Sequence, residues 1–410
     1  MTEQQLQPEK QNTQRPPLSQ VALLFLRLGL TAFGGPAAHI AMMQTEVVEQ
    51  RRWLTRQEFL DLLGAANLIP GPSSTELAIF IGYRLAGGAG LALAGACFIL
   101  PAFLMVLAIA WAYVRYGKLP QVGRALYGVK PVVIAILVQA IWNLGRTAIK
   151  NRALAVLGTV ALIPAALGAS PLLVLLGAGL LVGGWKWSQD RSLASLQPLL
   201  ILSSILGLFA IAPLLLNLAH LTPEHVGSVG SDRSVGHIGL SALFWVFLKV
   251  GSVIYGSGYV LLAFLKADLV SQRGWLTQAQ LLDAVSIGQV TPGPVFTTAT
   301  FIGFVLGGPT GALVATIGIF LPAFVFVALA GPFARKLRSA PVTGAFLDGV
   351  NAAAVALIVA VSWQLARSAL VDPITIAIAV ISLAALLRFR INTTWLIAAG
   401  LIIGIVFGRV

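Results

Sequence analysis

Long apolar segments separated by short polar turns run through almost the whole chain. In the first half the pattern predicts helices near 19–45, 58–86, 90–114, 127–148, 152–167 and 170–187. A helix needs about 20 apolar residues to cross a bilayer, and these segments lack the period-two alternation of a barrel strand. The pattern therefore predicts an all-α polytopic membrane protein, in which the two shortest segments barely span.

Composition agrees with a membrane protein. Hydrophobic residues make up 58% of the 410 residues and charged residues 10%, against roughly 25% charged residues in a globular protein. The net charge of +13 fits basic cytoplasmic loops and anionic lipids, because no aromatic-rich basic module suggests a nucleic-acid partner. The single cysteine, Cys97, excludes an intramolecular disulfide and argues against a cysteine metal cluster. No cofactor and no metal are expected.

The second half of the chain repeats the first at a fixed spacing. Pro70-Gly71-Pro72 recurs 222 residues later as Pro292-Gly293-Pro294, and Leu100-Pro101-Ala102-Phe103 recurs 221 residues later as Leu321-Pro322-Ala323-Phe324. Such matches indicate a duplication. We expect a polar cytoplasmic N-terminal tail over 1–17, a first repeat over 18–187, a connector over 188–239 and a second repeat over 240–410. The connector combines one transmembrane helix near 197–219 with a polar loop, whose three histidines are too irregularly spaced to predict a metal site.

Six spans per repeat and one connector helix give about 13 transmembrane helices. Because each repeat has an even number of spans and the connector adds a single span, the second copy enters the membrane from the opposite side and is inverted. The charges agree with inversion: Arg146, Lys150 and Arg152 precede the fifth span of repeat one, whereas Arg388 and Arg390 follow that of repeat two. Under the positive-inside rule, the sequence predicts two inverted-topology repeats, with the N-terminus cytoplasmic and the C-terminus periplasmic.

Inverted repeats are typical of transporters whose substrate site lies where broken helices meet. Proline lacks a backbone donor, so Pro70, Pro72, Pro292 and Pro294 must interrupt their spans around Gly71 and Gly293. Each break starts a new half-helix whose free N–H groups favour an anion. Hydroxyl donors follow at Ser73, Ser74, Thr297 and Thr298. The alternative is a pair of kinks that only shape packing.

Polar residues inside the apolar spans add to this hypothesis. Arg27 and Lys249 are matched cations about nine residues into their spans, where a charge is costly; snorkelling to the interface is the alternative. Asn67 and Gln289 lie three residues before a break and could donate to substrate or to freed backbone groups. Together these positions favour a negatively charged substrate.

Two polar positions differ between the repeats. Glu76 corresponds to Thr297 or Thr298, and His39 corresponds to Leu261. Glu76 could carry a proton or tune the site, since a bound dianion nearby would favour its protonated form; a carboxylate satisfying a helix start is the alternative. His39 is a candidate for the same tuning role, against a structural one.

At these residues the chain resembles the chromate ion transporter (CHR) family in its long two-domain form. The resemblance rests on Phe33-Gly34-Gly35-Pro36-Ala37-Ala38-His39, on Asn67-Leu68-Ile69-Pro70-Gly71-Pro72 with Ser74-Thr75-Glu76, and on Gln289-Val290-Thr291-Pro292-Gly293-Pro294. It implies chromate efflux across a bacterial inner membrane, giving chromate resistance, with sulfate as a competitor. A sulfate or other oxyanion transporter and an anion channel are the alternatives, and a homodimer stays open.

Energetics favour export. The chain has no ATPase signature, so transport draws on gradients. A dianion leaving a cell that is negative inside by 100 mV gains about 4.6 kcal/mol. An enzyme acting on a lipid-linked substrate would need a catalytic constellation that the sequence does not offer.

Overall fold

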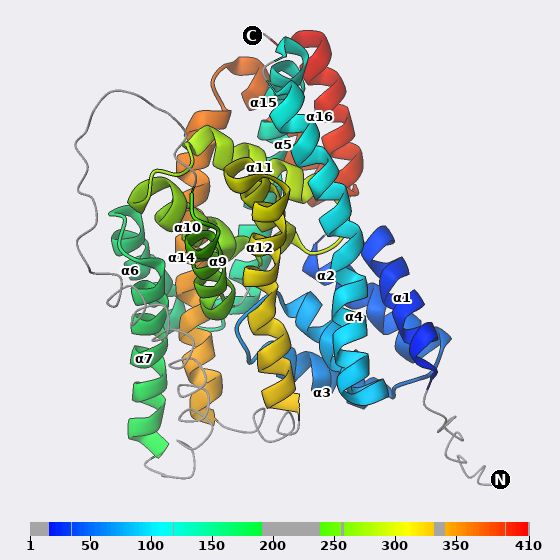
Figure 1. The fold of residues 1–410 in the computed structure, drawn as a ribbon. Coiled ribbons are helices and arrows are strands. Elements are labelled where there is room, and N and C mark those ends of the chain that lie inside the picture. The colour runs from blue at the N-terminus through cyan, green and yellow to red at the C-terminus, as the bar shows by residue number, and fades with distance from the viewer. Residues whose placement is uncertain are drawn as a thin grey trace, which may run out of the picture.

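The computed structural model describes residues 16–33, 35–117, 119–190, 238–255, 258–331, 341–389 and 391–408, and its elements carry the labels of Figure 1. These segments contain helices and turns and no strand, which confirms the all-α fold class. The predicted connector helix near 197–219 and the polar loop after it lie outside the described residues. The first repeat comprises α1 (Leu18–Thr31), α2 (Pro36–Gln44), the π-helix η1 (Thr45–Gln50), α3 (Arg56–Ala66), α4 (Ser73–Tyr116), α5 (Pro120–Ala148), α6 (Arg152–Ala166) and α7 (Pro171–Asp190).

The second repeat follows the same order. It comprises α9 (Leu240–Val253), η3 (Gly258–Val260), α10 (Leu261–Leu265), the π-helix η4 (Lys266–Gln272), α11 (Gln278–Val290), η5 (Val295–Thr297), α12 (Thr298–Ala330), α14 (Pro341–Ala369), α15 (Pro373–Arg388) and α16 (Thr393–Phe407). The long arms of α4 and α12 run in opposite directions, and so do α5 and α14 (Figure 1). The two copies are therefore inverted relative to each other, as the sequence predicts.

The predicted Pro-Gly-Pro breaks are confirmed. In the first repeat α3 ends at Ala66 and α4 begins at Ser73, and in the second α11 ends at Val290 and η5 begins at Val295. The expected continuous span at 19–45 is wrong, because α1 ends at Thr31 and α2 begins only at Pro36. Gly35, with φ +79°, makes this turn next to a proline. Each repeat thus contains two breaks.

Helix α4 folds back on itself. At Gly87 φ is +61°, so the chain turns sharply and Gly82 meets Gly90 across the hairpin. A Cβ atom at Gly82 would lie 2.2 Å from the carbonyl oxygen of Gly90, so only glycine permits this approach. Helix α12 repeats the device with Gly308 at the turn. The short first arm of α4 therefore begins at one break and ends at a hairpin.

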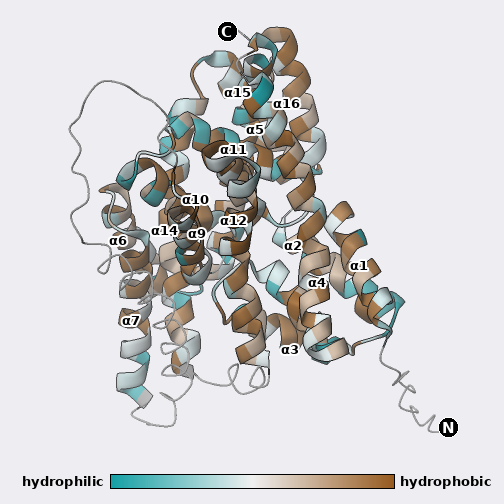
Figure 2. Cartoon of the chain, in the orientation of Figure 1, coloured by the Kyte–Doolittle hydropathy of each residue, from teal (hydrophilic) through white to brown (hydrophobic). Residues whose placement is uncertain are grey.

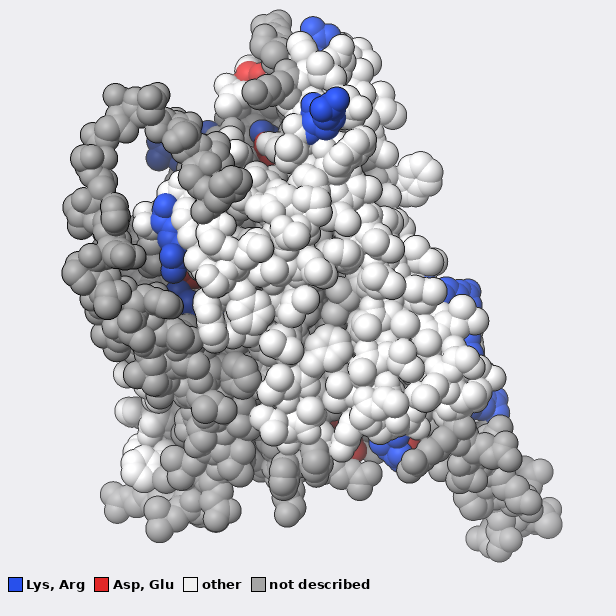
Figure 3. Space-filling model, in the orientation of Figure 1, with Lys and Arg blue, Asp and Glu red and all other residues white. Residues whose placement is uncertain are grey.

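The described surface suits a bilayer. Among the described residues, five helices are long and apolar enough to cross a membrane, and five shorter apolar helices accompany them. Apolar residues dominate the outer faces of the long helices (Figure 2), and the described surface over α4 and α12 is almost free of charge (Figure 3). The chain is a multi-pass membrane protein. The number of about 13 spans stays a prediction.

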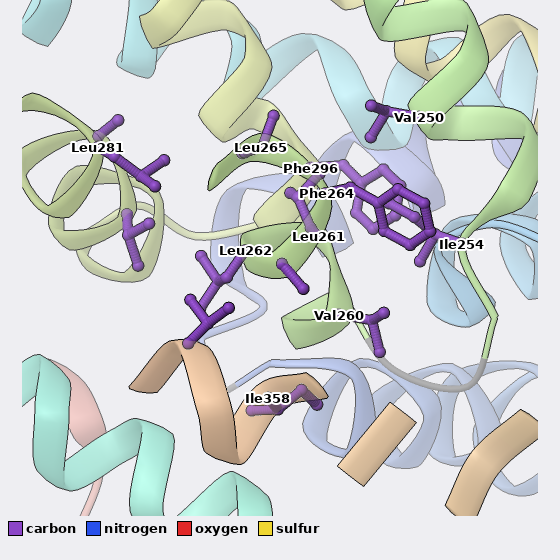
Figure 4. Packing of buried hydrophobic residues seen from close by; sticks show 14 of the residues in the cluster. Val250, Ile254, Val260, Leu261, Leu262, Phe264, Leu265, Leu281, Phe296 and Ile358 are labelled. Carbon is purple, nitrogen blue, oxygen red and sulfur yellow. The ribbon is translucent and has the colours of Figure 1, made fainter. Parts of the chain in front are cut away.

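The interior packs tightly around the breaks. Phe264 and Phe296 lie together near Val250 and Ile254, where the second repeat is broken (Figure 4). Both phenylalanine side chains are fully buried. Apolar side chains therefore pack closely beside the second Pro-Gly-Pro element.

Candidate functional site

The breaks of the two repeats hold each other. The Gly71 amide donates a hydrogen bond to the carbonyl of Ile254 at 2.7 Å, and the Gly293 amide donates one to the carbonyl of Ala32 at 2.9 Å. These two bonds are equivalent under the repeat, since adding 222 converts Ala32 into Ile254 and Gly71 into Gly293. Each Pro-Gly-Pro element is thus anchored to the end of the first helix of the other repeat. The unwound segments meet at one place in the molecule.

A cavity of about 290 Å³, lined by both polar and apolar residues, opens beside this junction. Two helices begin at it, α2 at Pro36 and α4 at Ser73, and neither has a side-chain cap at its N-terminus. The first N–H groups of a helix have no partner within it and carry partial positive charge. The predicted half-helix start after the first Pro-Gly-Pro break is therefore present at the cavity, and a second helix start joins it; anion binding there stays a prediction. The lining residues are Pro36, Ala37, Ser73, Gln139, Ala140, Asn143, Leu144, Thr147, Gly258 and Tyr259.

Helix α5 supplies a polar face that the sequence analysis missed. Gln139, Asn143 and Thr147 recur every four residues and all line the cavity. This spacing places them on one face of a helix. Polar residues at four-residue intervals in an apolar span are the signal that could have identified them.

His39 ties the junction together. Its Nε2 lies 3.0 Å from the carbonyl oxygen of Ala32, and its Nδ1 lies 3.2 Å from Oγ of Ser74. Because a carbonyl only accepts, Nε2 carries the proton and Nδ1 accepts from the serine hydroxyl. The same Ala32 oxygen also accepts from Gly293. The buried imidazole therefore links both breaks to the start of α4.

The other predicted donors are used differently. The hydroxyls of Thr297 and Thr298 donate to Pro294 and Val295 carbonyls at 2.8 Å, so they satisfy backbone freed by the second break. Asn67 is exposed at the C-terminal cap of α3. Gln289 contacts the hydroxyl of Tyr259, a cavity residue. Gln289 thus reaches a residue that lines the cavity, and Asn67 is not among the lining residues.

Both predicted cations are ion-paired within their own repeat. Arg27 lies 3.4 Å from Glu46, and Lys249 lies 2.7 Å from Asp268. These pairs are also equivalent under the repeat. The Arg27 side chain is 65% exposed and that of Lys249 34%. Neither cation lines the cavity.

The sequence analysis missed a partly buried cluster of charged and polar groups around Asp283. Lys130 of α5 lies 2.8 Å from the carboxylate of Asp283 in α11, and the hydroxyl of Tyr113 donates to the same carboxylate at 2.8 Å. Asp283 matches Asp61 in the first repeat, but Lys130 matches Asn351. The aspartate could be found from the repeat, whereas its cation comes from a distant helix and has no matching pattern.

Inverted repeats, broken helices and a cavity at helix N-termini define a multi-pass membrane transporter. The family model for chromate transporters matches residues 19–183 and 241–405, so it covers both repeats and most of the chain. The chain belongs to the chromate transporter family.

Relatives resemble the chain over nearly their full length. It is 35% identical over 396 residues to the chromate transport protein of Cupriavidus metallidurans, covering 95% of this chain and 93% of the relative. It is 35% identical over 357 residues to the chromate transport protein of Pseudomonas aeruginosa, covering 86% and 82%. A probable chromate transport protein of Synechococcus elongatus is 34% identical over 370 residues, covering 89% of each chain. No solved structure gives a significant match.

Proposed function

We propose that this protein exports chromate, a tetrahedral oxyanion, across the bacterial inner membrane, with its N-terminus cytoplasmic and its C-terminus periplasmic. The observation that carries the proposal is the cavity at the starts of α2 and α4. Its lining offers hydroxyls, amides and helix N–H groups, and no acidic side chain. An oxyanion accepts hydrogen bonds on all sides, so a cavity rich in donors suits it. The names of the three relatives support chromate as the substrate.

Membrane potential supplies the driving force. A dianion leaving a cell that is negative inside gains about 4.6 kcal/mol at 100 mV. Uptake would need coupled cations merely to cancel that amount. Export of chromate in this way gives the cell chromate resistance.

Donors at the breaks bind the substrate and cations attract it. Ser73 donates directly, while Gly71 and Gly293 fix the junction and Gln289 acts through its contact with the cavity. Arg27 and Lys249 attract the arriving anion, which competes with the carboxylates paired to them. Sulfate shares the charge and shape of chromate and therefore competes for the same donors.

Chromate uptake into inside-out vesicles, energised to be positive inside, tests the proposal. Saturable uptake that sulfate blocks is expected. Asn143→Leu removes one donor to a charged oxyanion, worth about 1.5–3 kcal/mol, so KM should rise roughly 10- to 100-fold. Thr159→Val is the matched control, because this hydroxyl on the exposed face of α6 bonds only its own helix at Ala155. Equal kinetics for the two variants would place the substrate elsewhere.

An anion channel is the alternative function, since broken helices that offer N–H donors to an anion suit both classes. Uptake that rises linearly with chromate concentration, together with a measurable single-channel conductance, would favour a channel. Uptake that ignores sulfate would show that the cavity distinguishes more than charge and shape. Arg27→Ala and Lys249→Ala, measured in parallel, separate long-range attraction of the anion from its binding in the cavity. Salt screens attraction between exposed charges, so both variants should slow uptake more at low salt than at high salt.

A further inference from the structure

Glu76 is the least satisfied polar group at the junction. It lies one turn into α4 and is 0% exposed. Within the described part of the chain, neither of its carboxylate oxygens has a hydrogen-bond partner. A charged carboxylate in such a place would cost far more free energy than a neutral one. Its environment therefore suits the protonated acid.

The carboxyl group lies where both repeats meet. A Cβ atom at Gly71 would be 2.2 Å from Oε1 of Glu76, so the carboxyl packs directly against the glycine that bonds Ile254. The next residue, Tyr255, has a buried hydroxyl for which the described chain provides no partner, and it interacts electrostatically with Glu76. Two unpartnered polar groups from different repeats thus adjoin one break.

Charged groups on the neighbouring elements do not neutralise Glu76. The cations Arg27 on α1 and Arg84 on α4 are paired with Glu46 and Glu58. His39 on α2 has both ring nitrogens engaged, by Ala32 and Ser74, as described above.

The second repeat shows that the fold does not require this pair. There the position of Glu76 holds Thr297 or Thr298, whose hydroxyls bond their own backbone. The position of Tyr255 corresponds to Phe33. The same Pro-Gly-Pro break is thus built once without an acid and without a phenol. Packing alone does not explain why the first break carries both.

We propose that Glu76 is a proton-binding site completed by Tyr255, and that one proton travels on it with each exported oxyanion. This inference rests on the proposed function and deepens it. The bound anion favours the protonated acid, and its departure releases the proton on the far side. The protein then moves one net charge per chromate instead of two.

Reversal potentials of the full chain in liposomes measure that charge. At equal pH, a tenfold chromate gradient should be balanced by about 59 mV if one charge moves and about 30 mV if two move. We expect about 59 mV for the native protein and about 30 mV for Glu76→Gln, which cannot carry the proton. Glu49→Gln is the control, because it removes an exposed carboxylate of η1 and leaves the pair between Arg84 and Glu58 intact. Its value should match the native protein.

Two further arms separate the proton site from its alternatives. Hydrogen chromate entering as a monoanion would also move one charge, but then Glu76→Gln would keep about 59 mV and the proposal would be overturned. A value of about 30 mV for the native protein would overturn it as well.

Infrared difference spectroscopy detects the protonated carboxyl group of Glu76 and does not depend on chromate transport. A protonated carboxyl band should be present in the native protein, absent in Glu76→Gln and shifted in Tyr255→Phe. Absence of the band in the native protein overturns the site. If the native protein shows the band but does not transport chromate, the proton site is upheld and the proposed function is overturned.

Discussion

The ion pair between Lys130 and Asp283 offers a direct test of how burial sets the strength of a charge contact. The pair joins α5, which lines the cavity, to α11, which leads into the second break. The two side chains are 21% and 8% exposed. The pair between Lys150 and Asp348 is slightly shorter, at 2.6 Å against 2.8 Å, but its side chains are 60% and 30% exposed. Distance and burial therefore predict opposite rankings.

We expect burial to decide. Lys130→Met leaves the Asp283 carboxylate buried beside only the Tyr113 hydroxyl, which should lower the free energy of unfolding by about 3–5 kcal/mol. Lys150→Met removes an exposed pair and should cost about 0–1 kcal/mol. Asp283→Asn should cost less than Lys130→Met, because the more exposed ammonium can reach water with its flexible stem.

The double variant Lys130→Met/Asp283→Leu isolates the uncompensated charge. With both charges gone, most of the loss should be recovered, apart from about 1–3 kcal/mol for the Tyr113 hydroxyl left without its acceptor. Adding Tyr113→Phe should remove that remainder. Equilibrium unfolding in mixed detergent micelles measures each value. Equal losses for Lys130→Met and Lys150→Met would refute the reasoning.

Two further predictions concern the junction and the paired cations. Gly71→Ala should abolish transport, because at Gly71 φ is +140° and the new Cβ would strike Glu76. Gly88→Ala, at an open position of the α4 hairpin, should leave transport unchanged. The measurement is the transport rate per protein molecule inserted in vesicles. Lys249→Ala should destabilise the protein more than Arg27→Ala, because Asp268 is 5% exposed and loses its cation, whereas Glu46 keeps Arg51. Equilibrium unfolding in the same micelles ranks the two variants, and a reversed order would contradict the role of burial.

Much of the fold follows from local rules that the sequence displays. Proline and glycine fix the breaks at 70–72 and 292–294, the matched spacing indicates the duplication, and the loop charges indicate that the second copy is inverted. The break at Ala32–Gly35 was missed because its single proline comes at the first turn of a helix, where proline is tolerated. Apolar residues on both sides made one long span an equally good interpretation.

The candidate site was harder to predict than the fold. Ser73 was found because it follows a break. Asn143 belongs to a helix about 70 residues later. The four-residue spacing of Gln139, Asn143 and Thr147 marks a polar face of α5, but it does not show that this face closes the cavity. Arg27 was singled out because a charge in an apolar span is costly, but the partner that offsets this cost, Glu46, comes from the π-helix that packs beside it. Pairing of this kind depends on the tertiary arrangement.

The differences between the repeats indicate how a symmetric scaffold obtains one site. The shared glycines at the breaks and hairpins build the same frame twice, and two identical frames would bind an anion equally in both orientations. Several of the polar groups that distinguish the frames lie at the first break, beside it at Tyr255, and on α5. In the other repeat the equivalent position of each holds a residue of different chemistry: Glu76 corresponds to Thr297 or Thr298, Tyr255 to Phe33, Gln139 to Ala360 and Lys130 to Asn351. Symmetry thus provides two breaks of the same form, and under the proposed function these substitutions assign the oxyanion and its proton to the first of them.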